Sequence, residues 1–244
     1  MSDAIAPPAT APATDRTASL ARNSVAEAIG TGFLLMAVVG SGILGERLAG
    51  GNTAIALLAN ALSTAATLFA LIEWIAPLSG AHLNPLVTLI LLFRGDTGRR
   101  EAIAYVTAQF AGAVIGVTVA NAMFDAPLLA LSSHARSGFS QCLSEFVATF
   151  GLIGIVWVCT RLRPSSLSGI VAAYIGGAFW FTATDFANPA VTLARAFTDT
   201  FAGIRLLDVP GFLFAEAAGA TAAIMLFRWL VPAASQQVTS AAAR

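Results

Sequence analysis

The sequence has little charge and no lysine. Only 11% of its 244 residues are charged, the 13 basic residues are all arginine, and the formal net charge is zero. Without a basic block, nucleic acid is not expected as a partner. Hydrophobic residues make up 57% of the chain and the mean hydropathy is +0.78, well above the average for soluble proteins. We therefore expect one all-α integral membrane domain in contact with lipid, with little chain left for a soluble domain.

Cysteine and catalytic motifs are also scarce. The two cysteines, Cys142 and Cys159, lie in one apolar segment, and a helix would hold them about 25 Å apart, too far for a disulfide. The chain contains neither a zinc-protease H-E-x-x-H motif nor a G-x-S-x-G nucleophile elbow, and no plausible Cys–His pair. We expect no enzyme activity, no cofactor and no metal site.

Long apolar runs dominate what is present. They predict six membrane-spanning helices, at about 25–44, 53–75, 102–124, 139–160, 167–181 and 212–230. Residues 1–21, rich in Ala, Pro and Thr, are expected to be a disordered cytoplasmic tail, since they lack the basic start and apolar core of a signal peptide. Residues 232–244 are expected to be a second cytoplasmic tail, which leaves 22–231 as the membrane domain.

Two shorter apolar runs, 84–93 and 188–197, each begin with an Asn-Pro pair. Asparagine is a good helix N-cap and proline is favoured at the first helical position. Ten helical residues span about 15 Å, half of a 30 Å hydrocarbon core, so such a helix must enter the membrane and return. Two capped half-helices that meet at the midplane are typical of a pore. The two triplets are Asn84, Pro85, Leu86 and Asn188, Pro189, Ala190.

The two halves of the chain repeat. Glu27 and Thr31 correspond to Glu145 and Thr149 at an offset of 118 residues, and the Asn-Pro segments correspond at an offset of 104. Gln109 corresponds to Glu216 at an offset of 107. The repeat units are about 22–124 and 139–231. Because each has three spans, the units have opposite orientations, which gives an inverted repeat.

Arginine placement predicts the orientation. With the N-terminus inside, nine arginines are cytoplasmic and four are outside, which favours cytoplasmic termini at both ends. The four outside arginines are Arg47, Arg136, Arg195 and Arg205.

The segments SGAHLNP and FANPAVTLAR, with the paired Glu27 and Glu145, resemble the aquaporin or major intrinsic protein family over about residues 22–231. The resemblance implies the aquaporin fold, six spans with two re-entrant half-helices. It also implies a homotetramer with one pore per subunit, in the bacterial inner membrane. Asn84 and Asn188 would direct side-chain N–H donors at the permeating molecule. Glu27 and Glu145 are expected to accept hydrogen bonds from the re-entrant loops, and His82 to lie near the inner pore.

The sequence departs from the common family pattern at three positions: Leu86 replaces Ala in the first box, Val191 replaces the usual arginine, and Asp185 precedes the second box. Family spacing places Thr64 and Gly176 at the same constriction as Asp185 and Val191. Such a constriction has no aromatic wall and no guanidinium, and is expected to be wide. Arg195 is expected on the outer surface; the alternative is that it faces the pore mouth or pairs with Asp185.

These features predict a passive channel for small uncharged solutes such as water, glycerol or urea. The run FANPAVTLAR also resembles a bacterial subgroup linked with arsenic resistance, which implies undissociated arsenite or methylated arsenicals as cargo. Two alternatives stay open. A secondary active transporter would need Glu73, Asp185 or Glu216 at a coupling-ion site, and an ion-conducting channel would use Asp185.

Overall fold

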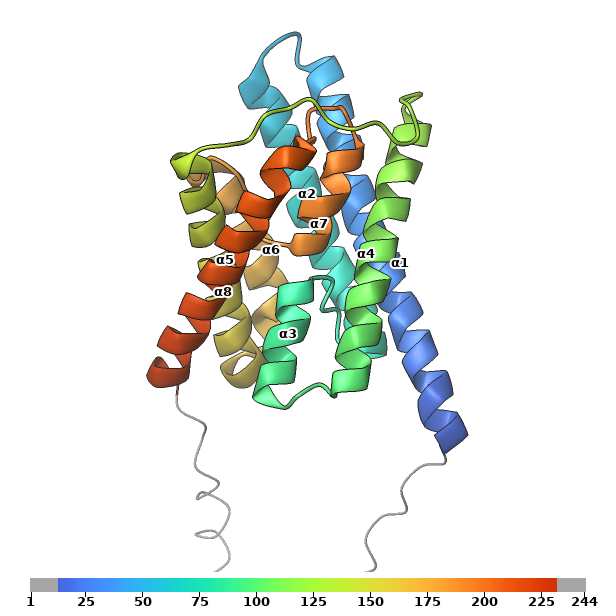
Figure 1. Ribbon diagram of the computed structural model, residues 1–244, viewed down its shortest axis with the longest axis vertical. Coiled ribbons are helices and arrows are strands. Elements are labelled where there is room, and N and C mark those ends of the chain that lie inside the picture. The colour runs from blue at the N-terminus through green and yellow to red at the C-terminus, as the bar shows by residue number, and fades with distance from the viewer. Residues whose placement is uncertain (1–12, 232–244) are drawn as a thin grey trace, which may run out of the picture.

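In the computed structural model, which describes residues 13–231 and side chains from residue 19 on, the chain is a bundle of helices (Figure 1). The elements in chain order are α1 (Ala13–Leu48), α2 (Thr53–Ser79), α3 (Pro85–Arg94), α4 (Arg99–Met123), α5 (Phe139–Leu162), η1 (Pro164–Ser166), α6 (Leu167–Phe181), α7 (Pro189–Ala194), η2 (Arg195–Phe197), η3 (Leu206–Asp208) and α8 (Val209–Leu230).

The expected spans are present. Within residues 13–231, five helices are long and apolar enough to cross a membrane: α1, α2, α4, α5 and the segment formed by η3 and α8. The sixth expected span, 167–181, is α6, whose 15 residues give about 22 Å of helix. With α3 and α7 as the two short helices, the predicted fold of six spans and two half-helices is confirmed.

The first helix begins earlier than expected. Residues 13–21, assigned from sequence to a disordered tail, form the first turns of α1, which runs without a break from Ala13 to Leu48. The segment ATDRTASLAR has no proline or glycine to end a helix, and three prolines lie before it in the sequence. The rest of the expected tail, residues 1–12, and the second expected tail, 232–244, lie outside the described residues.

The half-helices approach each other from opposite ends of the bundle, with their first turns facing in the middle (Figure 1). Asn84 caps α3 and Asn188 caps α7, each in an extended conformation with its side-chain oxygen accepting from the backbone. A glycine at 95 with φ of +83° ends α3, whereas α7 tightens after one and a half turns into η2. The two half-helices therefore differ in length and in how they end.

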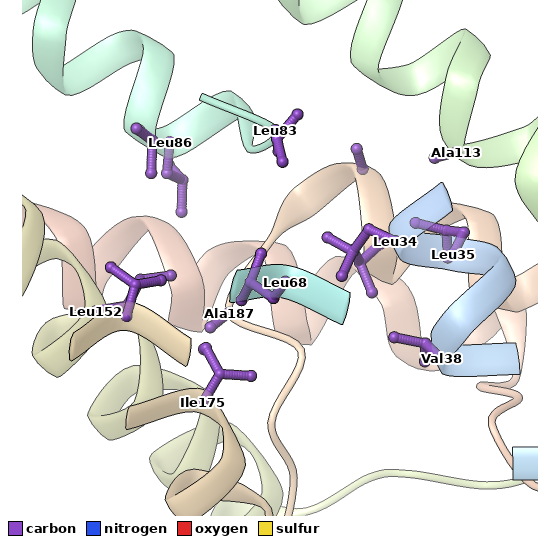
Figure 2. Packing of buried hydrophobic residues seen from close by; sticks show 14 of the residues in the cluster. Leu34, Leu35, Val38, Leu68, Leu83, Leu86, Ala113, Leu152, Ile175 and Ala187 are labelled. Carbon is purple, nitrogen blue, oxygen red and sulfur yellow. The ribbon is translucent and has the colours of Figure 1, made fainter. Parts of the chain in front are cut away.

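Glycines let the two halves pack in the same way. A Cβ at Gly112 of α4 would overlap the carbonyl oxygen of Ala28 on α1, and a Cβ at Gly219 of α8 would overlap that of Phe146 on α5. Helix backbones therefore touch at two equivalent crossings, as small residues allow in membranes. Buried Leu, Ile, Val and Ala side chains from both halves surround the re-entrant loops, including Leu34, Leu68, Leu152 and Ile175 (Figure 2).

Residues 125–138, here called the outer loop, connect α4 to α5 across one end of the bundle (Figure 1). Its backbone is bonded to the segment after α7: Ala130 N–H donates to Phe197 O at 3.1 Å, and Ser132 N–H donates to Ala196 O at 3.0 Å. The two ends of the described chain lie at the opposite end of the bundle. The outer loop is therefore fixed to the second half-helix.

Candidate functional site

The two asparagines bind each other's loops. Asn84 Nδ2 donates to the carbonyl of Ala187 at 2.8 Å, and Asn188 Nδ2 donates to the carbonyl of Leu83 at 2.8 Å. Each side-chain oxygen accepts from its own half-helix, at 2.9 Å from Leu86 N–H and 3.0 Å from Ala190 N–H. Each amide thus keeps one N–H that has no protein partner within residues 13–231, and both asparagines line the same cavity.

The residue before each asparagine has a left-handed backbone. Leu83 has φ of +50° and Ala187 has φ of +47°. Residues other than glycine in such a conformation cost about 1–3 kcal/mol each, so the surroundings must hold them. The strain aims the Leu83 and Ala187 carbonyls at the opposite asparagine, which explains why it occurs at the same place in both repeats.

Two buried glutamates hold these strained loops. Glu27 accepts from the N–H groups of His82 at 2.9 Å and Leu83 at 2.7 Å, and Glu145 accepts from Phe186 at 3.0 Å and Ala187 at 2.9 Å. Both carboxylates are fully buried. A hydrogen bond to a charged acceptor contributes about 1.5–3 kcal/mol, enough to offset the backbone strain. Each glutamate therefore connects a spanning helix to the backbone of a re-entrant loop.

A second buried polar residue supports each loop, with a different chemistry. Gln109 of α4 donates to Glu27 at 2.8 Å and to Thr88 at 3.0 Å. Its counterpart Glu216 of α8 instead accepts, from Asn188 N–H at 3.2 Å and from the Thr192 hydroxyl at 2.5 Å. The first loop is held by an amide that donates and the second by a carboxylate that accepts.

One cavity passes between the half-helices. It has about 100 Å³ open to the centres of water-sized molecules, and its lining extends from Thr160 and Leu167 at one end to Asp185 and Arg195 at the other. The amino-terminal ends of α3 and α7 meet beside it, so their partial positive charges point at its middle and oppose a cation there. The cavity is mostly apolar, with few polar groups that could replace the hydration shell of a solute.

The inner half of the cavity is lined by His82 and by apolar residues. The His82 ring packs edge-on against Tyr105 at 5.1 Å between centroids, and its Nδ1 lies 3.1 Å from Thr88 Oγ1. At the inner end, Arg94 donates to Thr160 at 2.6 Å and forms an ion pair with Asp96 at 2.8 Å. Leu86 is 9% exposed and belongs to the apolar core beside the first box.

The outer half contains one acidic and one basic side chain. Arg195 is 5% exposed; its guanidinium lies 3.4 Å from the centroid of the Phe186 ring, and its Nε donates to the carbonyl of Ala202. Asp185 also lines the cavity, and both of its carboxylate oxygens are buried without a hydrogen-bond partner among the described residues. No ion pair joins Asp185 to Arg195 in the described part of the chain.

A protein-family model matches most of this chain. The model for "Major intrinsic protein" matches residues 14–187. The chain belongs to the major intrinsic protein family. It is 50% identical over 213 residues to the aquaglyceroporin AqpS of Rhizobium meliloti (strain 1021), covering 87% of this chain and 91% of that one. It is 32% identical to the aquaporin TIP1-2 of Zea mays, covering 72% and 74%.

A solved structure shares the fold of this major intrinsic protein. The X-ray structure of the aquaglyceroporin from Plasmodium falciparum superposes with a TM-score of 0.67 and covers 86% of this chain and 95% of that one. At 20% sequence identity the match shows the fold alone.

For this family member, the lining of the outer half differs from the sequence-based expectation. Thr64, Asp185 and Val191 line the cavity, whereas a Cβ at Gly176 would point at Ala65 of α2. On α6 the side chains of Ile175 and Phe179 face the cavity in its place. Family spacing misplaced the register because the segment between α6 and the second box forms no helix, so its length does not fix which face of α6 turns inward.

The expected absence of an aromatic wall and of a guanidinium is also corrected. Phe179, Phe186 and Arg195 line the cavity together with Thr64 and Val191. Of the two placements considered for Arg195, the structure has the one that faces the pore and not the one on the outer surface. Arg195 is buried because η2 follows α7 and keeps position 195 on the face that Val191 occupies one turn earlier. The equivalent residue of the first repeat, Leu91, 104 residues earlier, lines the cavity too.

Sequence analysis did not single out the part of the outer loop that reaches the site. Arg136 lies behind Phe186, and Asp199 binds the outer loop from the exposed side. Hydrogen bonds from the Ser133 N–H at 2.8 Å and the Ser133 hydroxyl at 2.9 Å lower the pKa of Asp199. A loop has no periodicity that would show which of its residues point inward, so the sequence carried no signal for Arg136.

Proposed function

We propose that this protein is a passive channel for small uncharged solutes, with water and glycerol as the solutes that its relatives support. The observation that carries the proposal is the reciprocal pair of hydrogen bonds from Asn84 and Asn188 around one cavity. A solute that leaves part of its hydration shell meets the remaining N–H of each asparagine in turn. Passage of this kind needs no covalent step, so we propose transport and no enzyme activity.

The outer constriction is the proposed place of selection. Thr64, Asp185, Val191 and Arg195 line it. Asp185 supplies acceptors, Arg195 supplies donors, the Thr64 hydroxyl can do either, and Val191 is apolar. Urea and glycerol carry both kinds of group, so they are proposed cargo. Undissociated arsenite and methylated arsenicals are proposed as well, because they are small and neutral and the run FANPAVTLAR resembles the arsenic-linked subgroup.

The proposed setting is the bacterial inner membrane, with both termini cytoplasmic and four subunits in a homotetramer. The arginine distribution supports this orientation, as does the position of both ends of the described chain at the end of the bundle opposite the outer loop. The tetramer rests on the family resemblance. The mass of the detergent-solubilised protein by light scattering tests it.

The direct test is light scattering from proteoliposomes challenged separately with water, glycerol, urea and arsenite gradients. The expected result is flux well above that of empty vesicles, abolished by Val87→Trp, which fills the lumen. The matched control Leu58→Trp adds the same ring on an exposed face of α2 and leaves the flux unchanged. Flux that requires a proton or sodium gradient would instead identify a secondary active transporter, and electrical conductance would identify an ion channel.

A further inference from the structure

Two arginines from different parts of the chain hold three consecutive carbonyls. Arg136 Nη2 donates to Phe201 O at 3.0 Å and its Nε donates to Gly203 O at 2.7 Å. Arg195 Nε donates to Ala202 O, between them. A Cβ at Gly203 would overlap the hydroxyl of Ser132, so this segment is also packed closely against the outer loop.

The same two arginines share one aromatic ring. The guanidinium carbon of Arg136 lies 5.5 Å from the centroid of Phe186, and that of Arg195 lies 3.4 Å from it. A guanidinium stacked on a ring loses its freedom to rotate out of that plane. Since Nε of Arg195 is occupied by Ala202, only its two terminal nitrogens remain, and the side chain lines the cavity.

Arg136 is itself fixed from outside the cavity. Its backbone N–H donates to Asp208 Oδ2 at 2.8 Å, and Asp208 is held by Arg205 at 2.9 Å. In the outer loop beside it, the carbonyl of His134 accepts from Arg205 N–H at 2.7 Å. Arg136 therefore connects the start of α8 to the segment that binds Arg195, although it is not among the residues that line the cavity.

We propose that Arg136 is a positioning residue for selectivity: by holding Phe201 O and Gly203 O beside Phe186, it fixes Ala202 O and thereby the lumen-facing pose of Arg195. In the outer half, the direction of the N–H groups that Arg195 offers to a solute oxygen therefore depends on Arg136, a residue of the outer loop that is not among those lining the cavity. Without the two hydrogen bonds from Arg136, the 201–203 segment shifts and the Arg195 guanidinium loses its fixed direction. This inference rests on the proposed channel function and identifies the residue that keeps Arg195 in position.

The test is a double-variant cycle on the ratio of glycerol permeability to water permeability in proteoliposomes. This ratio does not depend on how many channels each vesicle contains. We expect Arg136→Gln to lower the ratio by about threefold or more, and Arg195→Leu to lower it in the same direction. Because Arg136 acts through Arg195, adding Arg136→Gln to Arg195→Leu lowers the ratio no further. If the two residues acted independently, the ratio of the double variant would fall by the product of the two single-variant effects. That result would overturn the proposal.

Arg47 provides a matched control. It donates from Nη2 to the carbonyl of Phe124 at 2.6 Å and lies 5.6 Å from that ring's centroid, the same kind of contact away from the cavity. Arg47→Gln leaves the ratio unchanged. If Arg136→Gln does not yield folded protein, Arg136→Lys replaces it, since a single ammonium cannot hold both carbonyls and the ratio falls.

The outcomes separate this inference from the proposed function. A parent protein that conducts neither water nor glycerol contradicts the proposed function itself. A conducting parent whose ratio is the same in Arg136→Gln, in folded and monodisperse protein, contradicts the role of Arg136 alone.

Discussion

The two halves of the molecule share one scaffold and differ in what they present to the cavity. In both, a buried glutamate holds a strained loop and an aromatic pair packs edge-on behind it: His82 with Tyr105 at 5.1 Å, and Phe186 with Phe212 at 5.2 Å. The residues that line the cavity are not equivalent in the two halves. Ala81 and Leu91 of the first half occupy the positions that Asp185 and Arg195 occupy in the second.

The residues that are the same in both halves position the half-helices, whereas the residues that differ line the part of the cavity where we propose that solutes are selected. The asparagines, glutamates and helix crossings hold the half-helices in place, so both copies need them. Asp185 and Arg195 both lie in the outer half, whereas the lining of the inner half is apolar apart from His82 and Thr160.

The largest effect is expected from the shared scaffold. Glu27→Ala and Glu145→Ala each leave at least two buried backbone N–H groups without an acceptor, at about 1–3 kcal/mol per group. We expect both variants to melt at much lower temperature in detergent than the parent. Glu46→Ala, which removes an exposed carboxylate of α1, is the control and melts like the parent. Parent-like melting of either scaffold variant would show that the carboxylates do not hold the loops.

A smaller effect is expected from filling the outer half. Val191→Arg adds a second guanidinium one turn before Arg195 on the same side of the cavity. The long side chain narrows the lumen, so glycerol permeability falls by about tenfold while water keeps much of its flux. The equivalent change in the inner half, Val87→Arg, tests whether the larger loss of glycerol than of water permeability is specific to the outer half. An unchanged glycerol-to-water ratio in Val191→Arg places the size limit elsewhere, at Leu86 for example.

A weaker perturbation exchanges one acceptor for a donor. Asp185→Asn keeps the shape of the side chain and one of its oxygens, but replaces the other oxygen, which has no partner among the described residues, with an NH2 donor. We expect the ratio of urea to glycerol permeability to change by a few-fold, because the two solutes differ in the donors that they offer. Equal ratios for the variant and the parent between pH 5 and 8 would remove Asp185 from the selecting group.

The smallest effect is expected at the surface of the outer loop. Hydrogen bonds from Ser133 lower the pKa of Asp199 in the folded state. The unfolded chain therefore binds the proton more tightly than the folded protein does. Its stabilisation is present above the ordinary aspartate pKa and is lost as the pH falls through the lower, folded value. Asp199→Asn therefore lowers the melting temperature slightly at neutral pH, and by less as the pH falls below the ordinary aspartate range. A melting difference that stays the same as the pH falls would contradict this linkage.

The scaffold could be predicted from the sequence, whereas much of the outer wall could not. Asn84, Asn188, Glu27 and Glu145 stand in a repeated pattern, and apolar length predicts the spans. The pose of Arg195 depends on α7 tightening into η2, and the register of α6 on an irregular segment, neither of which has a periodic signal. Arg136 acts through hydrogen bonds between a loop and backbone carbonyls, which composition does not encode.

We propose that hydrogen bonding by Asp185 and Arg195, and not width alone, lets glycerol pass. The direct measurement is glycerol permeability of the double variant Asp185→Ala, Arg195→Leu, which gives the outer half the residues of the inner half. Its lumen is wider and apolar, and each lost hydrogen bond to a desolvated solute costs about 1–3 kcal/mol. Our account predicts that glycerol permeability falls by about tenfold or more. Permeability equal to or above that of the parent would contradict it and show that size alone sets the selection.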